Sequence, residues 1–371
     1  MNSRERLLAA FDRKIPDRVP ISTYGLVGHN DKRFENKDLS YSALMDVVRQ
    51  KTDCIYMWDP PSDLVLLESA YPLRVDVEKT RENGHVITRK RFFTPKGEVT
   101  QTTKVMDGVH TVWQTEHLCK NLADVDKVLS VPFEPVTYDF ASFEQHKADL
   151  GDNGIIMTTL TDPLWTTADL MEFGEFTIWA ITEEERFKKA LEIVHNRCME
   201  NLTRMLDNCT VDMYRICGSE YATPPYLPPR LFEKFVTPYV REMVELIHSR
   251  GAKARLHCHG KIGEVLDMIT ATGCDSIDPC EAPPDGDIAL ADVKDRIGDQ
   301  MCILGNIQMH LLETASREEV REAVKTSMAA AKRGGGFVIM PTASPINSPL
   351  SPRTEENYME FIEASLEFGS Y

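Results

Sequence analysis

Residues 251–286 read GAKARLHCHGKIGEVLDMITATGCDSIDPCEAPPDG and predict a strand, a helix and a second strand. The short run before His257 is typical of a strand, and the apolar spacing of 262–269 is typical of a helix that ends at Gly273. The second strand follows at 274–278. Strand–helix–strand units of this kind form parallel α/β sheets, in which functional groups gather at the carboxyl ends of the strands.

The same alternation continues along the rest of the chain. We expect eight strands separated by helices, an order that favours a (β/α)₈ TIM barrel, with a doubly wound sheet as the alternative. The expected strands are 18–24, 53–58, 154–159, 212–217, 252–256, 274–278, 300–306 and 337–340, and the expected helices are 3–14, 41–51, 122–129, 140–150, 165–173, 183–208, 231–250, 262–269, 316–333 and 355–368.

Residues 73–115 differ from the rest because their apolar residues repeat with a period of two. The segments on either side of Asn83-Gly84 alternate in this way, and that dipeptide is a strong hairpin signal. Glu98–Met106 continues the alternation. We therefore expect an antiparallel β-ribbon inserted after the second strand, within a single barrel domain that spans 1–371.

Composition and charge limit the possible partners. The 371 residues are 42% apolar and 27% charged, as in an ordinary globular protein. A formal charge of −16 argues against a nucleic-acid surface. The sequence has no apolar run of membrane-spanning length, and Met1–Glu5 is charged and does not resemble a signal peptide. We expect a cytoplasmic protein with neither a nucleic acid nor a membrane as its partner.

The cysteine content favours a reducing compartment. The chain has nine cysteines, an odd number, and no C-x-x-C pair. Most of them lie in apolar segments, which is typical of buried thiols and not of a disulfide framework.

Polar groups at three neighbouring strand ends predict a metal site. His257 and His259 are two residues apart, so both can project to the same side of the fifth strand. Glu220 follows the fourth strand and Glu281 the sixth, which places them on either side of the histidines. Two imidazoles and two carboxylates are a plausible ligand set for zinc with an exchangeable position. The alternatives are core or capping histidines and glutamates paired with rim cations.

Other residues are weaker candidates for the site. Cys258 and Cys280 are alternative ligands, and thiolate ligation would change the chemistry of the ion. Several side chains that follow strands could line a substrate pocket, although ordinary packing explains any single one. These are Tyr24, Trp58, Trp165, Tyr221 and Asn306.

Five stretches of the sequence carry a resemblance to a known family. They are SRERL with PDRVP (3–7 and 16–20), GSE (218–220), LHCHG (256–260) and LGNI (304–307). Together they resemble the uroporphyrinogen decarboxylase superfamily, and specifically its corrinoid-dependent methyltransferase branch. The resemblance spans nearly the whole chain and implies a barrel that can pair as a homodimer.

Two departures from the family patterns bear on the activity. Decarboxylases of the family bind substrate carboxylates through an arginine-rich motif, and the matching stretch 21–26 (ISTYGL) has no arginine. Methyltransferases with thiol acceptors bind zinc through an H-x-C pair and a later cysteine. Here the pair is His257 and His259, and 341–344 reads PTAS. We expect Glu281 and Glu220 to replace the missing ligands, which leaves a harder ion suited to an oxygen ligand.

The resemblance and these departures together lead to one expected activity. We expect a zinc-dependent methyltransferase that moves a methyl group from an O-methylated donor, with a methoxylated aromatic favoured, to the cob(I)alamin of a separate corrinoid protein. Zn²⁺ held by His257, His259, Glu281 and Glu220 would act as a Lewis acid on the ether oxygen. Glu220 and Glu281 are therefore also the candidate catalytic residues.

Three alternatives stay open at this point. One is a metal-free decarboxylase of a polycarboxylate, like uroporphyrinogen decarboxylase itself. Another is a methyltransferase that works from the methylcorrinoid to an acceptor. The last is a non-catalytic binding protein that has kept the barrel. The sequence does not identify the methyl donor.

Overall fold

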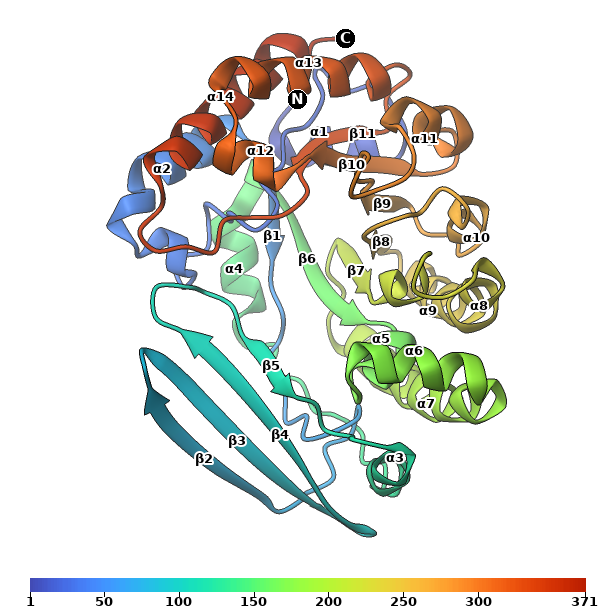
Figure 1. The fold of residues 1–371 in the computed structure, drawn as a ribbon. Helices are drawn as coiled ribbons and strands as arrows, with labels where there is room; N and C mark the ends of the chain where they lie inside the picture. The colour runs from blue at the N-terminus through green and yellow to red at the C-terminus, as the bar shows by residue number, and fades with distance from the viewer.

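The computed structural model describes residues 1–371 and has a curled sheet of seven parallel strands at its centre. Helices cover the outer side of this sheet (Figure 1). The spatial order of the strands follows the chain, as in a barrel, so the predicted TIM-like architecture is confirmed. The strands are β1 (Cys54–Met57), β6 (Gly154–Thr161), β7 (Met213–Cys217), β8 (Lys253–Cys258), β9 (Ser276–Pro279), β10 (Cys302–Ile307) and β11 (Phe337–Pro341).

The first predicted strand, 18–24, is not a regular strand. It forms only two isolated bridges, a parallel one between Ile21 and Ile339 of β11 and an antiparallel one between Arg18 and Ser370. On its other side, the carbonyl of Ile21 accepts from the N–H of Asp53, just before β1. Pro20 has no N–H to donate, and Tyr24 adopts a positive φ of 55°, so the extended conformation cannot continue. The prediction of eight regular strands was therefore wrong by one, although this segment lies where the eighth strand of a closed barrel would lie.

The helices follow the predicted order with one clear break. The expected helix 231–250 is two helices, α8 (Pro229–Phe235) and α9 (Thr237–Ser249), because Pro238 has no N–H for the carbonyl four residues earlier and is accommodated only in the first turn of a new helix. The sequence analysis also missed α6, α11 and α12. The other bounds are α1 (Ser3–Phe11), α2 (Ser42–Lys51), α3 (Leu122–Leu129), α4 (Phe143–Leu150), α5 (Pro163–Ala168), α6 (Phe173–Thr182), α7 (Glu184–Asn208), α10 (Leu266–Thr270), α11 (Leu290–Ile297), α12 (Met309–Thr314), α13 (Arg317–Ala331) and α14 (Pro352–Phe368).

The insertion after β1 forms a separate antiparallel sheet, which confirms that part of the prediction. Figure 1 shows it at the lower left, projecting away from β8–β11. Asn83 and Gly84 both have positive φ, as the hairpin turn requires. A short fourth strand, which was not predicted, pairs with β4 beyond a register shift. The strands are β2 (Val75–Glu82), β3 (His85–Thr94), β4 (Gly97–Met106) and β5 (Trp113–Glu116).

Helix α1 closes the amino-terminal end of the barrel. It begins with a capping box in which Asn2 and Glu5 each accept a hydrogen bond from the backbone of the other. Its residues Leu7 and Phe11 are fully buried and pack in one cluster with inward-facing residues of the strands, among them Leu304. The interior of the barrel is therefore apolar at this end.

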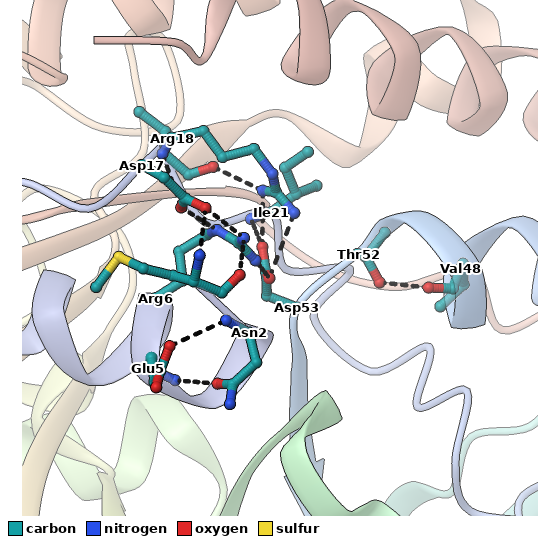
Figure 2. A network of polar contacts seen from close by, with 11 residues as sticks. Asn2, Glu5, Arg6, Asp17, Arg18, Ile21, Val48, Thr52 and Asp53 are labelled. Carbon is teal, nitrogen blue, oxygen red and sulfur yellow. Dashed lines mark hydrogen bonds and ion pairs between the residues drawn. The ribbon is translucent and has the colours of Figure 1, made fainter.

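A network of charged side chains holds α1 against the barrel (Figure 2). The carboxylate of Asp53, at the start of β1, is fully buried and accepts hydrogen bonds from Arg6 Nη1 (2.6 Å) and Arg18 Nη1 (2.8 Å). The backbone N–H of Ile21 also donates to it (2.9 Å). On the outer side, Arg6 Nε donates to the more exposed Asp17 (2.6 Å). One buried carboxylate thus joins α1, the 18–21 segment and β1.

The cysteines and the apolar character of the helices concern the chain as a whole. All nine cysteines are free, and all but Cys209 are buried, as their positions in apolar segments predicted. None of the helices combines the length and the apolar character that a membrane crossing requires.

Candidate functional site

The strand register brings the predicted site residues to one end of the barrel. Cys217 of β7 is the register partner of His257 on β8, and His257 is the partner of Asp278 on β9. Residues that follow these strands therefore meet at the carboxyl edge of the sheet. They border a pocket of about 470 Å³, whose lining residues are Phe173, Glu220, Tyr221, Tyr226, His259, Gly260, Glu281 and Asp285.

His257 is held from behind by a buried carboxylate. Its Nδ1 donates to Asp278 Oδ2 (2.7 Å), and Asp278 Oδ1 accepts from Arg255 Nε (2.5 Å). Burial lowers the pKa of His257 to about 4, although Asp278 acts in the opposite direction. Burial alone would raise the pKa of Asp278, but Arg255 and His257 hold it well below its usual range. His257 is therefore neutral, with its proton on Nδ1 and the lone pair of Nε2 free.

His259 is also held by a carboxylate, and it lies nearer the opening of the pocket. Its Nδ1 lies 3.0 Å from Glu281 Oε1, and Glu281 Oε2 accepts from the N–H of Gly260 (2.8 Å). Burial lowers the pKa of His259, but the contact with Glu281 outweighs it and the net direction is upward. The two imidazole rings lie perpendicular, with 4.5 Å between their centroids. Because each Nδ1 faces a carboxylate, Nε2 is the atom that each ring keeps for a ligand.

Glu220 lies in a tight turn after β7, in the 3-10 helix η4 (Ser219–Ala222). Its Oε2 accepts from the N–H of Gly218 (3.0 Å), and burial raises the pKa of its carboxyl. Gly218 has a φ of 130°, and a Cβ there would meet Asp162 Oδ1 at 2.2 Å, so only glycine fits this turn. The close approach of the turn to the loop after β6 positions Glu220.

Asp162 forms hydrogen bonds that hold this turn in place. Its carboxylate accepts hydrogen bonds from the N–H of Trp165 (2.7 Å) and from the Ser219 hydroxyl (2.9 Å). Burial, together with the charge of Glu220, raises the pKa of Asp162 to about 7 despite these hydrogen bonds.

The four predicted ligands are not preassembled around one point. No group of three or more His, Cys, Asp or Glu side chains is placed to hold a metal ion. Glu281 uses one oxygen for His259 and the other for Gly260, so it lies behind a histidine and not beside it. The donor chemistry nevertheless fits zinc, because metal-binding histidines usually donate their second ring nitrogen to a carboxylate. The alternative ligands, Cys258 and Cys280, are buried, and burial raises the pKa of both thiols.

Two of the predicted pocket residues lie near the histidines. Tyr221 lines the pocket, and the Tyr24 ring is 6.2 Å from that of His257. Trp165 packs against Tyr221, with 5.9 Å between ring centroids, but borders a different pocket.

The other two predicted pocket residues point elsewhere. Trp58 packs against Phe143 (5.1 Å between centroids) and donates to the Ser142 hydroxyl, beneath α4. Asn306 donates to the carbonyl of Cys280 and accepts from Ser327 of α13. Both side chains join elements of the fold and do not line the pocket of the histidines.

The sequence analysis missed the charged residues inside the barrel. Three charged side chains are buried there: Arg215, Arg255 and Asp278. They lie two residues before Cys217, His257 and Cys280, respectively. The signal was present, because a charged residue at an inward position of a buried strand is rare and needs a partner. Arg255 has that partner in Asp278, whereas Arg215 has no carboxylate paired with it.

Comparison with known proteins identifies the family. Residues 110–364 match the family described as uroporphyrinogen decarboxylase (URO-D). The chain belongs to the uroporphyrinogen decarboxylase family. It is 29% identical over 141 residues to the uroporphyrinogen decarboxylase of Vibrio cholerae and 31% identical over 115 residues to that of Aeromonas salmonicida. These matches cover 37% and 30% of this chain, and 37% and 31% of the two relatives, about a third of their length.

A solved structure extends the likeness of fold to the whole chain. A methyltransferase from Methanosarcina mazei superposes with a TM-score of 0.64 and covers 99% of both chains. At 16% identity, this similarity concerns the fold. The expected resemblance to the uroporphyrinogen decarboxylase superfamily is confirmed.

Proposed function

We propose that this member of the uroporphyrinogen decarboxylase family is a zinc-dependent methyltransferase. It would take a methyl group from an O-methylated aromatic donor and pass it to the cob(I)alamin of a separate corrinoid protein. The observation that carries the proposal is the pair of carboxylate-held histidines, His257 on Asp278 and His259 on Glu281. Carboxylate–histidine pairs of this kind orient imidazoles for metal binding.

The residues that would hold the ion differ in part from the predicted set. His257 and His259 would bind through Nε2, and Glu220, whose charge acts on His259, would be the third ligand. Glu281 would act as a positioning residue for His259, as Asp278 does for His257. Because no three of these side chains now surround one point, binding would require a change of side-chain conformation among them.

The remaining parts of the site suit an aromatic ether. Zinc, when bound, would supply a Lewis acid to the ether oxygen. Phe173, Tyr221 and Tyr226 form an aromatic wall, with centroid distances of 5.5 Å and 4.7 Å from Phe173 to the two tyrosines. In the reaction the methyl carbon–oxygen bond breaks, its electron pair stays on oxygen, and the methyl group passes to cobalt. The nucleophile comes with the partner, which explains why the site needs no serine or cysteine nucleophile.

The test is a demethylation assay with methoxylated aromatics and a reduced corrinoid protein, with and without a chelator. We expect bound zinc in the purified protein and activity that the chelator removes and zinc restores. His259→Ala should lose both, whereas His248→Ala, which removes an exposed histidine paired with Asp275 on the outer surface, should lose neither. Full activity in protein without any bound metal would reject the proposal.

A metal-free decarboxylase is the second candidate. The family match and the unpaired Arg215 inside the barrel favour it, since a buried guanidinium suits a substrate carboxylate. It predicts release of carbon dioxide that a chelator does not affect, which separates it from methyl transfer.

A further inference from the structure

Arg215 is a buried cation that forms no ion pair in the structure. Its side chain projects from β7 into the barrel, and the residue is only 7% exposed. One hydrogen bond is present, from Nη2 to the Tyr24 hydroxyl (2.6 Å), and Nε is buried without a partner. A guanidinium has five N–H donors, so most of its capacity is unused. Buried polar groups are normally hydrogen-bonded, which indicates that another group completes this site.

The surrounding carboxylates do not supply that group. Asp278 is the largest favourable charge acting on Arg215, but its two oxygens are engaged by Arg255 and His257. The barrel interior therefore contains two guanidinium groups, and both oxygens of the carboxylate between them are already taken. Glu220 and Asp59 lie within electrostatic range of Arg215, yet neither forms an ion pair with it. No carboxylate contacts the Arg215 guanidinium directly.

Tyr24 connects this charge to the histidines. Its hydroxyl accepts from Arg215, the Arg215 Cζ lies 5.4 Å from the centroid of its ring, and the same ring is 6.2 Å from His257. Tyr24 therefore adjoins both groups, and a ligand bound at Arg215 would lie close to the histidine pair. A planar carboxylate matches the fork of a guanidinium and can accept two of its free N–H groups.

We propose that Arg215 and Tyr24 bind the carboxylate of the substrate, so that the methyl donor is an O-methylated aromatic acid. This inference rests on the proposed function and deepens it by naming the donor class. The aromatic wall of the pocket would hold the ring, and the carboxylate would lie at the inner end.

The test measures binding directly, without a corrinoid protein. The probes are 4-methoxybenzoate and its neutral match 4-methoxybenzamide, titrated into the full chain in a calorimeter. We expect the acid to bind at least tenfold more tightly than the amide. Arg215→Met should remove this preference by weakening the acid alone, and Arg215→Lys should restore part of it. Tyr24→Phe, which keeps the charge, should retain most of the preference.

Arg197→Met is the matched control. Arg197 is buried to the same extent, 7% exposed, but donates to the carbonyls of Leu67 and Val131 outside the barrel. Its replacement should leave the preference unchanged in protein whose circular dichroism is native. Wild-type protein that binds the acid no more tightly than the amide would overturn the inference, and this comparison needs no variant to fold. Preference for the acid without demethylation would retain the Arg215 site and reject methyl transfer instead.

Discussion

The carboxylate of Asp278 lies between two side chains of the neighbouring strand, 2.5 Å from Nε of Arg255 and 2.7 Å from Nδ1 of His257. Arg255 and His257 face the same side of β8 because they are two residues apart. Asp278 thus neutralises a buried arginine and also fixes the ring nitrogen that His257 offers to the pocket. The stability of the barrel and the chemistry of the site depend on the same group.

Asp278→Asn is therefore expected to affect stability and zinc binding together. Arg255 would keep its buried charge without a counter-ion, and breaking such a pair costs about 3–5 kcal/mol in unfolding free energy. The amide can also donate to His257 Nδ1, which would place the ring proton on Nε2 and weaken zinc binding. Urea unfolding and competition with a chromophoric chelator measure the two effects. Asp267→Asn, with a carboxylate 86% exposed beside Arg296, should change stability by less than about 1 kcal/mol.

The proposed roles of Glu281 and Glu220 predict different losses of zinc affinity. Glu281→Gln removes a carboxylate that orients His259, and such changes typically weaken metal binding about 10- to 100-fold. Glu220→Gln removes a proposed ligand and should weaken it further. The measurement is a zinc competition titration of both variants beside the wild type. The reverse order would make Glu281 the ligand and Glu220 the supporting residue.

Asp162 should give the protein a stability that falls as pH rises. Its pKa is about 7 in the folded state and 3.8 in the reference state, so between these values the unfolded chain releases a proton that the folded chain keeps. Stability is then greatest below about pH 4 and decreases up to about pH 7, by roughly 4 kcal/mol for this group alone. Asp162→Asn stays neutral and should lack this decrease, so its stability relative to wild type should rise between pH 4 and 8.

Unfolding curves measured at a series of pH values test this. Asp295→Asn, which changes a carboxylate 68% exposed beside Arg333, serves as the control and should leave the pH profile almost unchanged. An Asp162→Asn profile parallel to that of wild type would show that Asp162 does not titrate in this range.

The network in Figure 2 predicts that Asp53 contributes much more to stability than Asp17. Asp53→Ala would leave Arg6 and Arg18 without their buried counter-ion and the N–H of Ile21 without its acceptor. We expect a loss of about 3–5 kcal/mol. Asp17, with a side chain 41% exposed, contacts the same Arg6, and Asp17→Ala should cost about 1 kcal/mol or less. Equal losses in thermal or urea unfolding would contradict this ranking.

Much of the barrel could be predicted from the order of apolar strands and helices, because parallel strands that are buried on both faces appear in the sequence as nearly continuous apolar runs. The predictions that were wrong have local causes. Residues 18–24 have strand-like composition, but the proline and the turn at Tyr24 restrict them to two isolated bridges. Pro238 was the sign of a break between α8 and α9. The apolar periodicity of that region continues across the break and led to the prediction of a single helix.

The sequence was enough to predict at which strand ends the site residues lie, but not how their side chains are arranged. Adjacent parallel strands place Glu220, His259 and Glu281 at one edge whatever their side-chain conformations are. Which oxygen faces which nitrogen depends on local turns, so the position of Glu281 behind His259 could not be read from spacing. Trp58 follows the last residue of β1, where alternation no longer determines direction, and it faces α4.

Closure of the barrel floor by Leu7 and Phe11 of α1 has a kinetic consequence for the proposed reaction. With one end sealed, a small donor and a large corrinoid partner would share a single entrance. The donor would have to arrive first and its demethylated product leave last, so steady-state kinetics should follow a compulsory order. Excess partner would then inhibit turnover by trapping the empty enzyme.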